Sequence, residues 1–162
     1  MTASGDDLPV PSRLVRYVPF GRMRREGDDN YPGPNPNAFE AREVDDYLSV
    51  TWCEYFAGSA DIQLRCAVEA IRSSNLAVKP KACFCVAKTS EVLATIQSTG
   101  REGRAIYLPE DDNPAHAGIY GIARDDTLLL ACLADEVWHV FLTKDAADAL
   151  PTGGCTRSAE VR

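Results

Sequence analysis

The chain has 162 residues, and 17 basic against 24 acidic side chains give it a formal net charge of −7. Apolar residues make up 45% and charged residues 25%, an ordinary globular composition that argues against collagen, coiled coil and wholesale disorder. The length suits a single domain with its own core. Because the chain is acidic, we expect no general coating of nucleic acid by its surface.

The sequence predicts a cytoplasmic protein without membrane segments. Residues 1–7 lack the basic segment and apolar run of a secretory signal. The longest nearly apolar stretch, residues 128–142, is interrupted by Asp135, Glu136 and His139, and a membrane span needs roughly 20 apolar residues. Six cysteines are too sparse for a disulfide scaffold, so we expect reduced thiols.

The first part of the chain combines loose segments with one strand. Residues 1–12 are polar and predict a flexible leader. Residues 13–20 combine β-branched, aromatic and charged residues, which predicts a strand that Pro19 ends. Residues 21–37 show no apolar period, so we expect a long loop, of the kind that is either functional or mobile.

Residues 47–52 alternate apolar and polar side chains and predict a second strand. Ser59 suits the N-cap of a helix over residues 60–73. Apolar residues at positions i, i+3, i+4 and i+7 of that helix predict one buried stripe; these are Leu64, Ala67, Val68 and Ile71.

The second half of the chain continues the alternation of strands and helices. The patterns predict strands over 82–87, 104–108 and 117–122, a short helix from Thr89 and a last helix over 127–142. Residues 151–162 lack a core-forming pattern and predict a flexible tail, which leaves one domain over 13–150. The order favours an α+β fold, with a small mixed or antiparallel sheet and about three packed helices.

No familiar cofactor or metal motif is present, so we expect no cofactor and no metal. Cys83 and Cys85 have no second close pair, which a structural zinc site usually needs, and a buried strand explains them equally well. Phosphate-binding glycine loops and the Gly-x-Ser-x-Gly nucleophile turn are absent from the sequence.

The segment Asn113-Pro-Ala-His-Ala-Gly-Ile-Tyr-Gly is the first candidate for chemistry. His116 stands among small residues just before a glycine-bearing strand, where a ligand or backbone can approach closely. Histidine suits proton transfer or contact with an anion near neutral pH. The alternative is structural, with His116 fixing the turn by hydrogen bonds to backbone.

Five arginines within 13 residues form the second candidate; they are Arg13, Arg16, Arg22, Arg24 and Arg25. Guanidinium groups bind phosphate and carboxylate in a bidentate manner, so Arg16, Arg22, Arg24 and Arg25 predict a local anion site. The alternative is a solvated edge that is neutralised by acidic neighbours, namely Asp28, Asp29, Glu40 and Glu43.

A polar strand face and nearby aromatic rings form the third candidate. Ser49 and Thr51 alternate with Leu48 and Val50, so their side chains share one face of the strand and line a pocket or face water. Two aromatic residues are the candidates for that pocket, Trp52 and Tyr120. Core packing is the alternative for Trp52.

Two stretches, Tyr47-Leu-Ser-Val and Asn113-Pro-Ala-His-Ala, together resemble short uncharacterised bacterial proteins. Those proteins share a Leu-Ser-Val strand and a later Asn-Pro-Ala-His-Ala turn. The resemblance implies no particular activity, but it suggests Ser49 and His116 as members of one recurring site.

Two functions remain open at this point. One is a small bacterial accessory protein that binds a larger protein partner and has a local arginine-rich anion site. The other is a small enzyme acting on a nucleotide or phosphoester, by ADP-ribosyl transfer or hydrolysis. In that enzyme Arg16 and Arg22 hold the anion, while Ser49 and His116 are catalytic.

Overall fold

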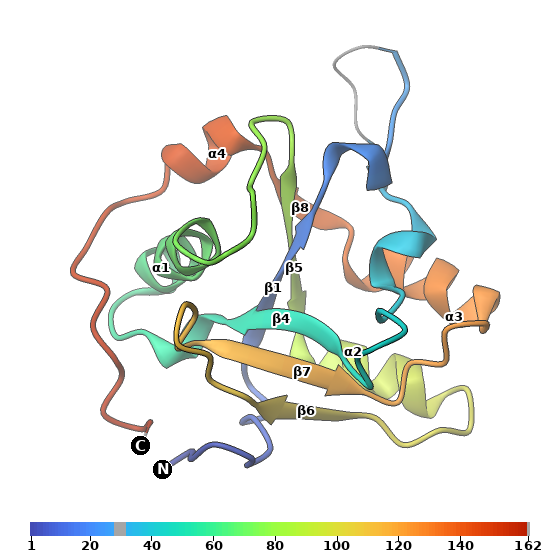
Figure 1. Ribbon diagram of the computed structural model, residues 1–162, viewed down its shortest axis with the longest axis horizontal. Helices are drawn as coiled ribbons and strands as arrows, with labels where there is room; N and C mark the ends of the chain where they lie inside the picture. The colour runs from blue at the N-terminus through green and yellow to red at the C-terminus, as the bar shows by residue number, and fades with distance from the viewer. Residues whose placement is uncertain (28–31, 162) are drawn as a thin grey trace.

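The computed structural model describes residues 1–27 and 32–161. Six antiparallel strands form its main sheet in the order β6-β7-β4-β1-β5-β8, and β2 (Met23–Arg24) pairs with β3 (Gly33–Pro34) in a small second sheet. Helices pack against the main sheet (Figure 1). The fold is therefore α+β, as the sequence predicts.

The strands of the main sheet differ in how far they pair. They are β1 (Arg13–Val18), β4 (Leu48–Trp52), β5 (Cys83–Lys88), β6 (Arg104–Tyr107), β7 (His116–Tyr120) and β8 (Val140–Leu142). All six residues of β1 pair with β5. On its other side β1 pairs with β4 only through Leu14 and Val15. The sheet is therefore open between β1 and β4 beyond Val15.

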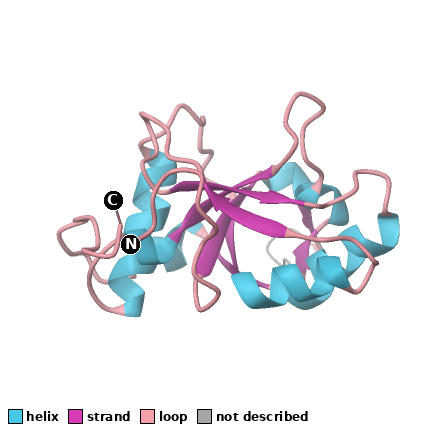
Figure 2. Cartoon of the chain, turned by 90° about the horizontal axis from the view of Figure 1, so that it is seen from below, coloured by secondary structure: helices cyan, strands magenta, loops and turns pink. Residues whose placement is uncertain are grey.

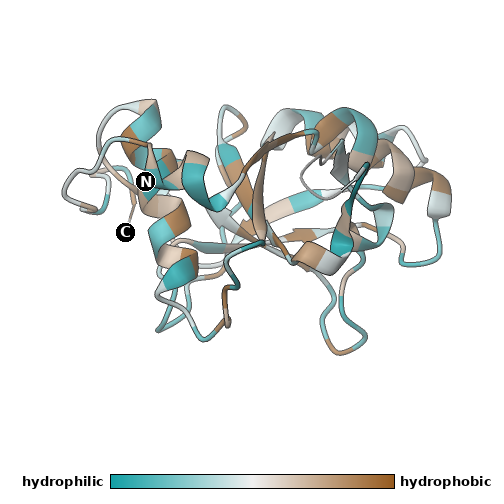
Figure 3. Ribbon diagram, turned by 90° about the horizontal axis from the view of Figure 1, so that it is seen from above, coloured by the Kyte–Doolittle hydropathy of each residue, from teal (hydrophilic) through white to brown (hydrophobic). Residues whose placement is uncertain are grey.

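Helices lie on both sides of this sheet (Figures 1 and 2). They are α1 (Ala60–Arg72), α2 (Thr89–Gln97), α3 (Thr127–Cys132) and α4 (Lys144–Asp148). The Ser59 hydroxyl accepts from the Ile62 N–H and so caps α1, as expected for a serine N-cap. The helices carry both polar and apolar residues (Figure 3), which lets each cover the sheet with one face and meet water with the other.

The last helix is shorter than its sequence pattern predicts. α3 continues as a π-helical segment, Leu133–Val137, and the chain then turns into β8, which pairs with β5. At this turn the fully buried Trp138 stacks on Phe39, with ring centroids 5.5 Å apart. The prediction of a helix to residue 142 is therefore wrong, because β8 continues the apolar stripe of the helix while supplying a partner for β5.

Both terminal segments, which we expected to be flexible, make ordered contacts. Leu8 is buried, and its N–H donates to the Ala105 carbonyl. In the tail, the Ser158 N–H donates to the Tyr55 carbonyl. The two ends of the chain also lie close together (Figure 1), with a parallel β-bridge between Thr2 and Val161.

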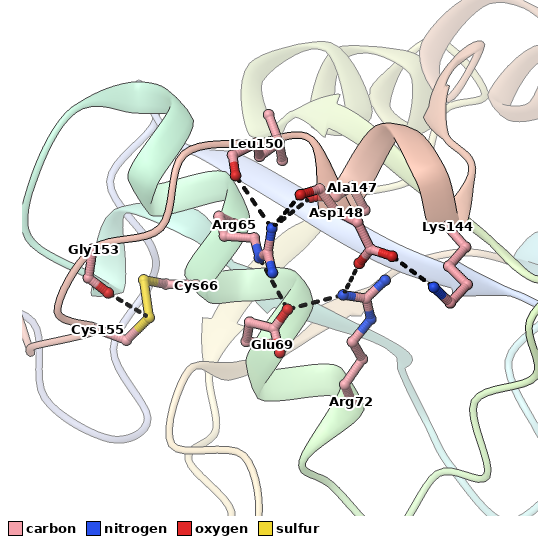
Figure 4. A network of polar contacts seen from close by, with 10 residues as sticks. All are labelled: Arg65, Cys66, Glu69, Arg72, Lys144, Ala147, Asp148, Leu150, Gly153 and Cys155. Carbon is pink, nitrogen blue, oxygen red and sulfur yellow. Dashed lines mark hydrogen bonds and ion pairs between the residues drawn. A yellow bond between two sulfur atoms is a disulfide. The ribbon is translucent and has the colours of Figure 1, made fainter.

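A disulfide joins Cys66 of α1 to Cys155 of the tail, across 89 residues of sequence (Figure 4). The expectation that all thiols are reduced is therefore wrong for this pair. No local pattern indicates this pairing, because the two cysteines lie far apart and in no recognisable spacing. Within the described residues, no helix is both long and apolar enough to cross a bilayer.

Charged residues of α1 and α4 form a polar network beside the disulfide (Figure 4). Arg65 pairs with Glu69, and Arg72 pairs with both Glu69 and Asp148. Arg65 also donates to three carbonyl groups, those of Ala147, Asp148 and Leu150. We call this set of contacts the α1–α4 network.

Candidate functional site

A cleft of about 950 Å³ lies where β1 and β4 separate. The end of α1 and the turn between β6 and β7 border it. Four of the residues that the sequence nominates line this cleft together: Arg16, Arg22, Ser49 and His116. The enzyme interpretation requires this gathering, because residues on opposite faces of the protein cannot share chemistry.

The pairing of β4 with β7 brings Ser49 and His116 to one face. Thr51 lies opposite His116, and Ser49 lies opposite Gly118. Directly paired residues point to the same side of an antiparallel sheet, and Ser49 and Thr51 are two positions apart. The alternation that the sequence shows in this strand therefore places the Ser49 hydroxyl near the His116 ring.

Asn113 builds the turn that presents His116. Its side-chain amide donates to Thr51 Oγ1 at 2.9 Å, and its side-chain oxygen accepts from the Ala115 N–H at 3.2 Å. Its backbone carbonyl accepts from the His116 N–H at 3.1 Å. Asn113 is 5% exposed, so these bonds form where water does not compete. Sequence reasoning pointed to the Asn113-Pro-Ala-His segment but assigned Asn113 itself no role.

The contacts of the His116 ring determine where its proton lies. Nδ1 lies 2.7 Å from the Leu108 carbonyl oxygen and Nε2 lies 3.3 Å from Ser49 Oγ. A carbonyl only accepts, so Nδ1 of the neutral ring carries the hydrogen and donates it. Nε2 is then left with its lone pair directed at the Ser49 hydroxyl. This is the tautomer that a general base for serine requires.

Glu110 lies on the far side of the His116 ring from Ser49. Its Oε1 is 3.6 Å from His116 Nδ1, and its side chain is 48% exposed. A carboxylate at this position stabilises the imidazolium that forms when the ring takes a proton. Sequence reasoning assigned Glu110 no role. The residue lies in an acidic turn just before His116, but no sequence pattern shows that this turn directs its carboxylate at the ring.

Arg16 occupies the gap between β1 and β4. Its Nη1 donates to the Ser49 carbonyl at 2.8 Å, and its Nε donates to the Ala38 carbonyl at 3.2 Å. Burial, with a smaller contribution from the charge of Arg22, lowers the pKa of Arg16 to about 10, so the guanidinium is still charged at neutral pH. Within the described residues Arg16 forms no ion pair with a carboxylate.

Arg22 is the second cation of the cleft. Its Nη1 donates to the Asn37 carbonyl at 3.1 Å, and like Arg16 it forms no ion pair among the described residues. Arg42, by contrast, lies 2.6 Å from the Asp45 carboxylate. We call Arg16 and Arg22 the cationic pair, since their charges are available to an anionic ligand.

Among the described residues, the acidic residues expected to neutralise the arginine group form no ion pair with it. Asp28 and Asp29 lie outside the described residues. Glu43 lies 3.7 Å from Arg124, which also lines the cleft. Glu40 lines the cleft as well. The cleft is therefore mixed in charge rather than uniformly basic.

The other nominated residues lie away from the cleft lining. Arg24 pairs with Asp135 at 2.6 Å, and the guanidinium of Arg25 lies over the Phe20 ring. Trp52 is buried in the core and packs against two aromatic rings, those of Tyr55 and Tyr107. Each of these three residues has a partner outside the cleft, and Arg24 and Arg25 line a separate hollow of about 640 Å³.

Tyr47 connects the cleft to Tyr120 and His116. Its ring lies 5.4 Å from the Tyr120 ring and 5.9 Å, edge-on, from the His116 ring. It also rests on Gly118, where a Cβ atom would approach the ring to 2.7 Å, so only glycine leaves room for it. Burial and the charge of Asp45 raise the pKa of Tyr47, which keeps its phenol protonated at neutral pH. Tyr47 lines the cleft, whereas Tyr120 contacts Tyr47 and is not part of the lining.

The cleft has no obvious relative and no evident metal centre. Among residues 1–27 and 32–161, no group of three or more His, Cys, Asp or Glu side chains is placed to hold a metal ion. Comparison with protein-family models, with curated proteins and with solved structures finds no match to this chain. The functional proposal therefore rests on the geometry of the cleft.

Proposed function

We propose that this chain is a small enzyme that cleaves an anionic phosphoester, with Ser49 as the nucleophile and His116 as its general base. The observation that carries the proposal is the 3.3 Å contact between Ser49 Oγ and the His116 Nε2 lone pair. The contact lies in a cleft that also holds the cationic pair. A nucleophile, an oriented base and cations for the developing charge are the parts that such a reaction needs.

The proposed reaction has two steps. Ser49 Oγ forms a bond to phosphorus while its proton moves to His116 Nε2. The bond from phosphorus to the leaving oxygen breaks, and the imidazolium gives its proton to that oxygen. Water, with His116 again as base, then attacks the phosphorus bound to Ser49. The bond from phosphorus to Ser49 Oγ breaks, the imidazolium returns its proton to Oγ, and the phosphoryl group leaves as a free phosphate or diphosphate.

The surroundings support each charge that this reaction develops. The Leu108 carbonyl fixes the ring and, with the Glu110 carboxylate, favours the imidazolium. The cationic pair offers guanidinium donors to the phosphoryl oxygens. His116 is only 5% exposed, so its contact with the Leu108 carbonyl is weakly screened by water. The half-exposed Glu110 and the exposed Arg22, by contrast, act through more strongly screened charges.

Transfer of ADP-ribose is a second candidate, favoured by the position of Glu110. Such transferases use an arginine, a serine on a strand and a glutamate, and the sequence alone offered no well-placed glutamate. Glu110 lies in the cleft with Arg16 and Ser49. In this reaction the bond between the ribose C1′ and its nitrogen leaving group breaks, and C1′ forms a bond to an acceptor nucleophile.

The accessory-protein function stays a prediction. In that case the chain binds a larger partner in a bacterial cytoplasm, and the cationic pair serves as a local anion site. It differs from the enzyme in one respect that an experiment can measure. A binding protein has no need for His116 to activate Ser49.

A fluorophosphonate probe tests the activation of Ser49 without knowledge of the substrate. Such a probe loses fluoride to a serine whose proton a neighbouring base removes. We expect one label per chain, on Ser49, with a rate that falls at least 100-fold in His116→Ala, in line with the general contribution of a base. His139→Ala and Ser90→Ala change exposed residues outside the cleft and are the matched controls.

Two outcomes contradict the Ser49–His116 mechanism. One is the absence of a label on Ser49 in a folded protein. The other is equal labelling of Ser49 in the wild type and in His116→Ala. Thermal unfolding of each variant shows whether the fold is retained.

A further inference from the structure

We infer that the cleft binds a nucleoside diphosphate, with the diphosphate on the cationic pair and the nucleoside toward Glu110 and Asp111. The inference rests on the proposed function, since it names the substrate class of the same site. It goes further because it assigns a ligand to the acidic and aromatic wall, which the proposed chemistry does not require.

A chain of contacts connects the site residues. Arg16 donates to the Ser49 carbonyl, and Ser49 Oγ lies 3.3 Å from one nitrogen of His116. Glu110 lies 3.6 Å from the other nitrogen of the same ring. Arg16 therefore reaches the Ser49–His116 contact from the Ser49 end, and Glu110 reaches it from the opposite nitrogen of the ring.

This order fits a ligand with unlike ends. The anionic end belongs near the cationic pair, where an acidic group gains charge-assisted hydrogen bonds. The end near Glu110 must be rich in donors, because carboxylates only accept hydrogen bonds. A chain of phosphates joined to a sugar with free hydroxyls has this polarity, and the phosphoester bond then lies at Ser49.

The cationic end suits two phosphates better than one. Arg16 uses its Nε and Nη1 on carbonyl groups, which leaves Nη2 for a ligand. Arg22 adds a second guanidinium that is close enough to lower the pKa of Arg16. Two cations without carboxylate partners in the described residues match a diphosphate in charge.

The wall beyond Ser49 suits a ribose and a base. Glu110 and the exposed Asp111 line it, and their carboxylates are suitable acceptors for ribose hydroxyls. Tyr47, held against Gly118, presents a ring on which a base can stack. Leu76, which lines the same cleft, is 52% exposed and offers apolar surface. The volume of about 950 Å³ is large enough for a nucleotide.

Calorimetric titration of the Ser49→Ala chain with α,β-methylene-ADP tests this inference, because without the proposed nucleophile the phosphoester bond next to the ribose stays intact. Methylenediphosphonate and adenosine serve as the two halves of the ligand. We expect the whole analogue to bind at least 10-fold more tightly than either half. Arg22→Gln should weaken binding of the analogue and of the diphosphonate at least 10-fold.

Asp111→Asn separates ribose recognition from general charge. We expect it to weaken binding of α,β-methylene-ADP at least 3-fold and to leave methylenediphosphonate unchanged. Asp61→Asn makes the same change on α1, outside the cleft, and should affect neither ligand. An equal effect of Asp111→Asn on both ligands, or equal affinity for analogue and diphosphonate, overturns the inference.

The outcome is separable from that of the labelling experiment. If Ser49 is labelled in a His116-dependent way but the analogue does not bind, the cleft cleaves another phosphoester and this inference is wrong. If the analogue binds but Ser49 is not activated, the cleft is a nucleotide site without the proposed catalysis. The variants of Arg22 and Asp111 then still report how the nucleotide is held.

Discussion

The cleft and the α1–α4 network use arginine in opposite ways. In the network, Arg65 and Arg72 both contact the Glu69 carboxylate, and Arg72 also reaches Asp148. In the cleft, Arg16 and Arg22 contact only backbone carbonyls among the described residues. The chain has seven more acidic than basic side chains, so the difference does not come from a shortage of carboxylates.

The contrast separates charge used for stability from charge kept for a ligand. A partly buried arginine without an anion is costly to the folded protein, and its pKa is lowered accordingly. Such a cost is common at functional sites, where other parts of the structure offset it. Variants in the two regions should therefore differ in kind: loss of stability in one region and loss of ligand binding in the other.

The disulfide beside the network should give the largest effect on stability. Cys66→Ser opens a loop of 89 residues, and we expect the free energy of unfolding to fall by about 4 kcal/mol through the gain in chain entropy of the unfolded state. Urea unfolding measures this. Cys132→Ser, which removes a free cysteine, is the control. An unchanged urea midpoint in wild type after addition of a reductant would contradict the prediction.

Loss of Arg65 should affect stability without affecting the cleft. Its side chain is 15% exposed and holds three carbonyl groups as well as Glu69. Arg65→Gln leaves some of these partly buried acceptors unsatisfied, so we expect a loss of about 2 kcal/mol in unfolding free energy. Affinity for α,β-methylene-ADP should not change. A drop in affinity at constant stability would break the contrast between the regions.

Arg22→Gln should give the reverse pattern. Because Arg22 is exposed and donates to one carbonyl, its loss should change the free energy of unfolding by less than about 0.5 kcal/mol. The 10-fold loss of diphosphonate affinity corresponds to about 1.4 kcal/mol of binding free energy. Calorimetry and urea unfolding of the same sample compare the two values. A stability loss without a binding loss would make Arg22 a structural residue.

Acid should weaken the network through Asp148. Hydrogen bonds from Lys144 and Arg72 lower the pKa of Asp148 below its ordinary value of 3.8. A carboxyl with a lowered pKa stabilises the folded state above its unfolded pKa, and this stabilisation is lost as the pH falls through the folded value. Asp148→Asn should therefore show a smaller drop in Tm than the wild type between pH 5 and pH 2. Equal drops would exclude a contribution from Asp148.

The reactivity of the free cysteines gives the smallest expected effect, because it reports only on the surroundings of each thiol. Burial raises the pKa of Cys83 to about 11 and that of Cys53 to about 12, and it raises the pKa of Cys85 as well. At pH 8 a thiol reagent should therefore react with the native protein at Cys132 alone, since thiolates are the reactive species. Mass spectrometry locates the label, and Cys132→Ser should abolish it. Early labelling of Cys83 or Cys85 would mean that β5 opens readily.

The elements that the sequence predicts correctly are those with a clear local period. β1, β4 and α1 begin at or within one residue of their predicted starts, because alternation and the Ser59 cap are local signals. β8 was missed, since its apolar residues continue a helical stripe and only pairing with β5 makes them a strand. Cys66 and Cys155 were missed for a related reason, as their contact depends on the path of the tail.

The same distinction applies to the site. The sequence nominated Ser49, His116, Arg16 and Arg22, because strand polarity, a histidine among small residues and an arginine cluster are visible locally. It missed the roles of Asn113 and Tyr47, which depend on the register of β4 with β7, and that of Glu110, which depends on how the turn between β6 and β7 folds. It also grouped Arg24 and Arg25 with the anion site, whereas their side chains contact Asp135 and Phe20.

The disulfide between Cys66 and Cys155 has a consequence for the protein after proteolysis. Arg16 and Ser49 precede the cross-linked loop, whereas Glu110 and His116 lie within it. A protease that cuts once between residues 66 and 155 releases no fragment while the S–S bond is intact. Both halves of the cleft then remain on one covalent molecule, so a nicked sample can keep its site until a reductant separates the pieces.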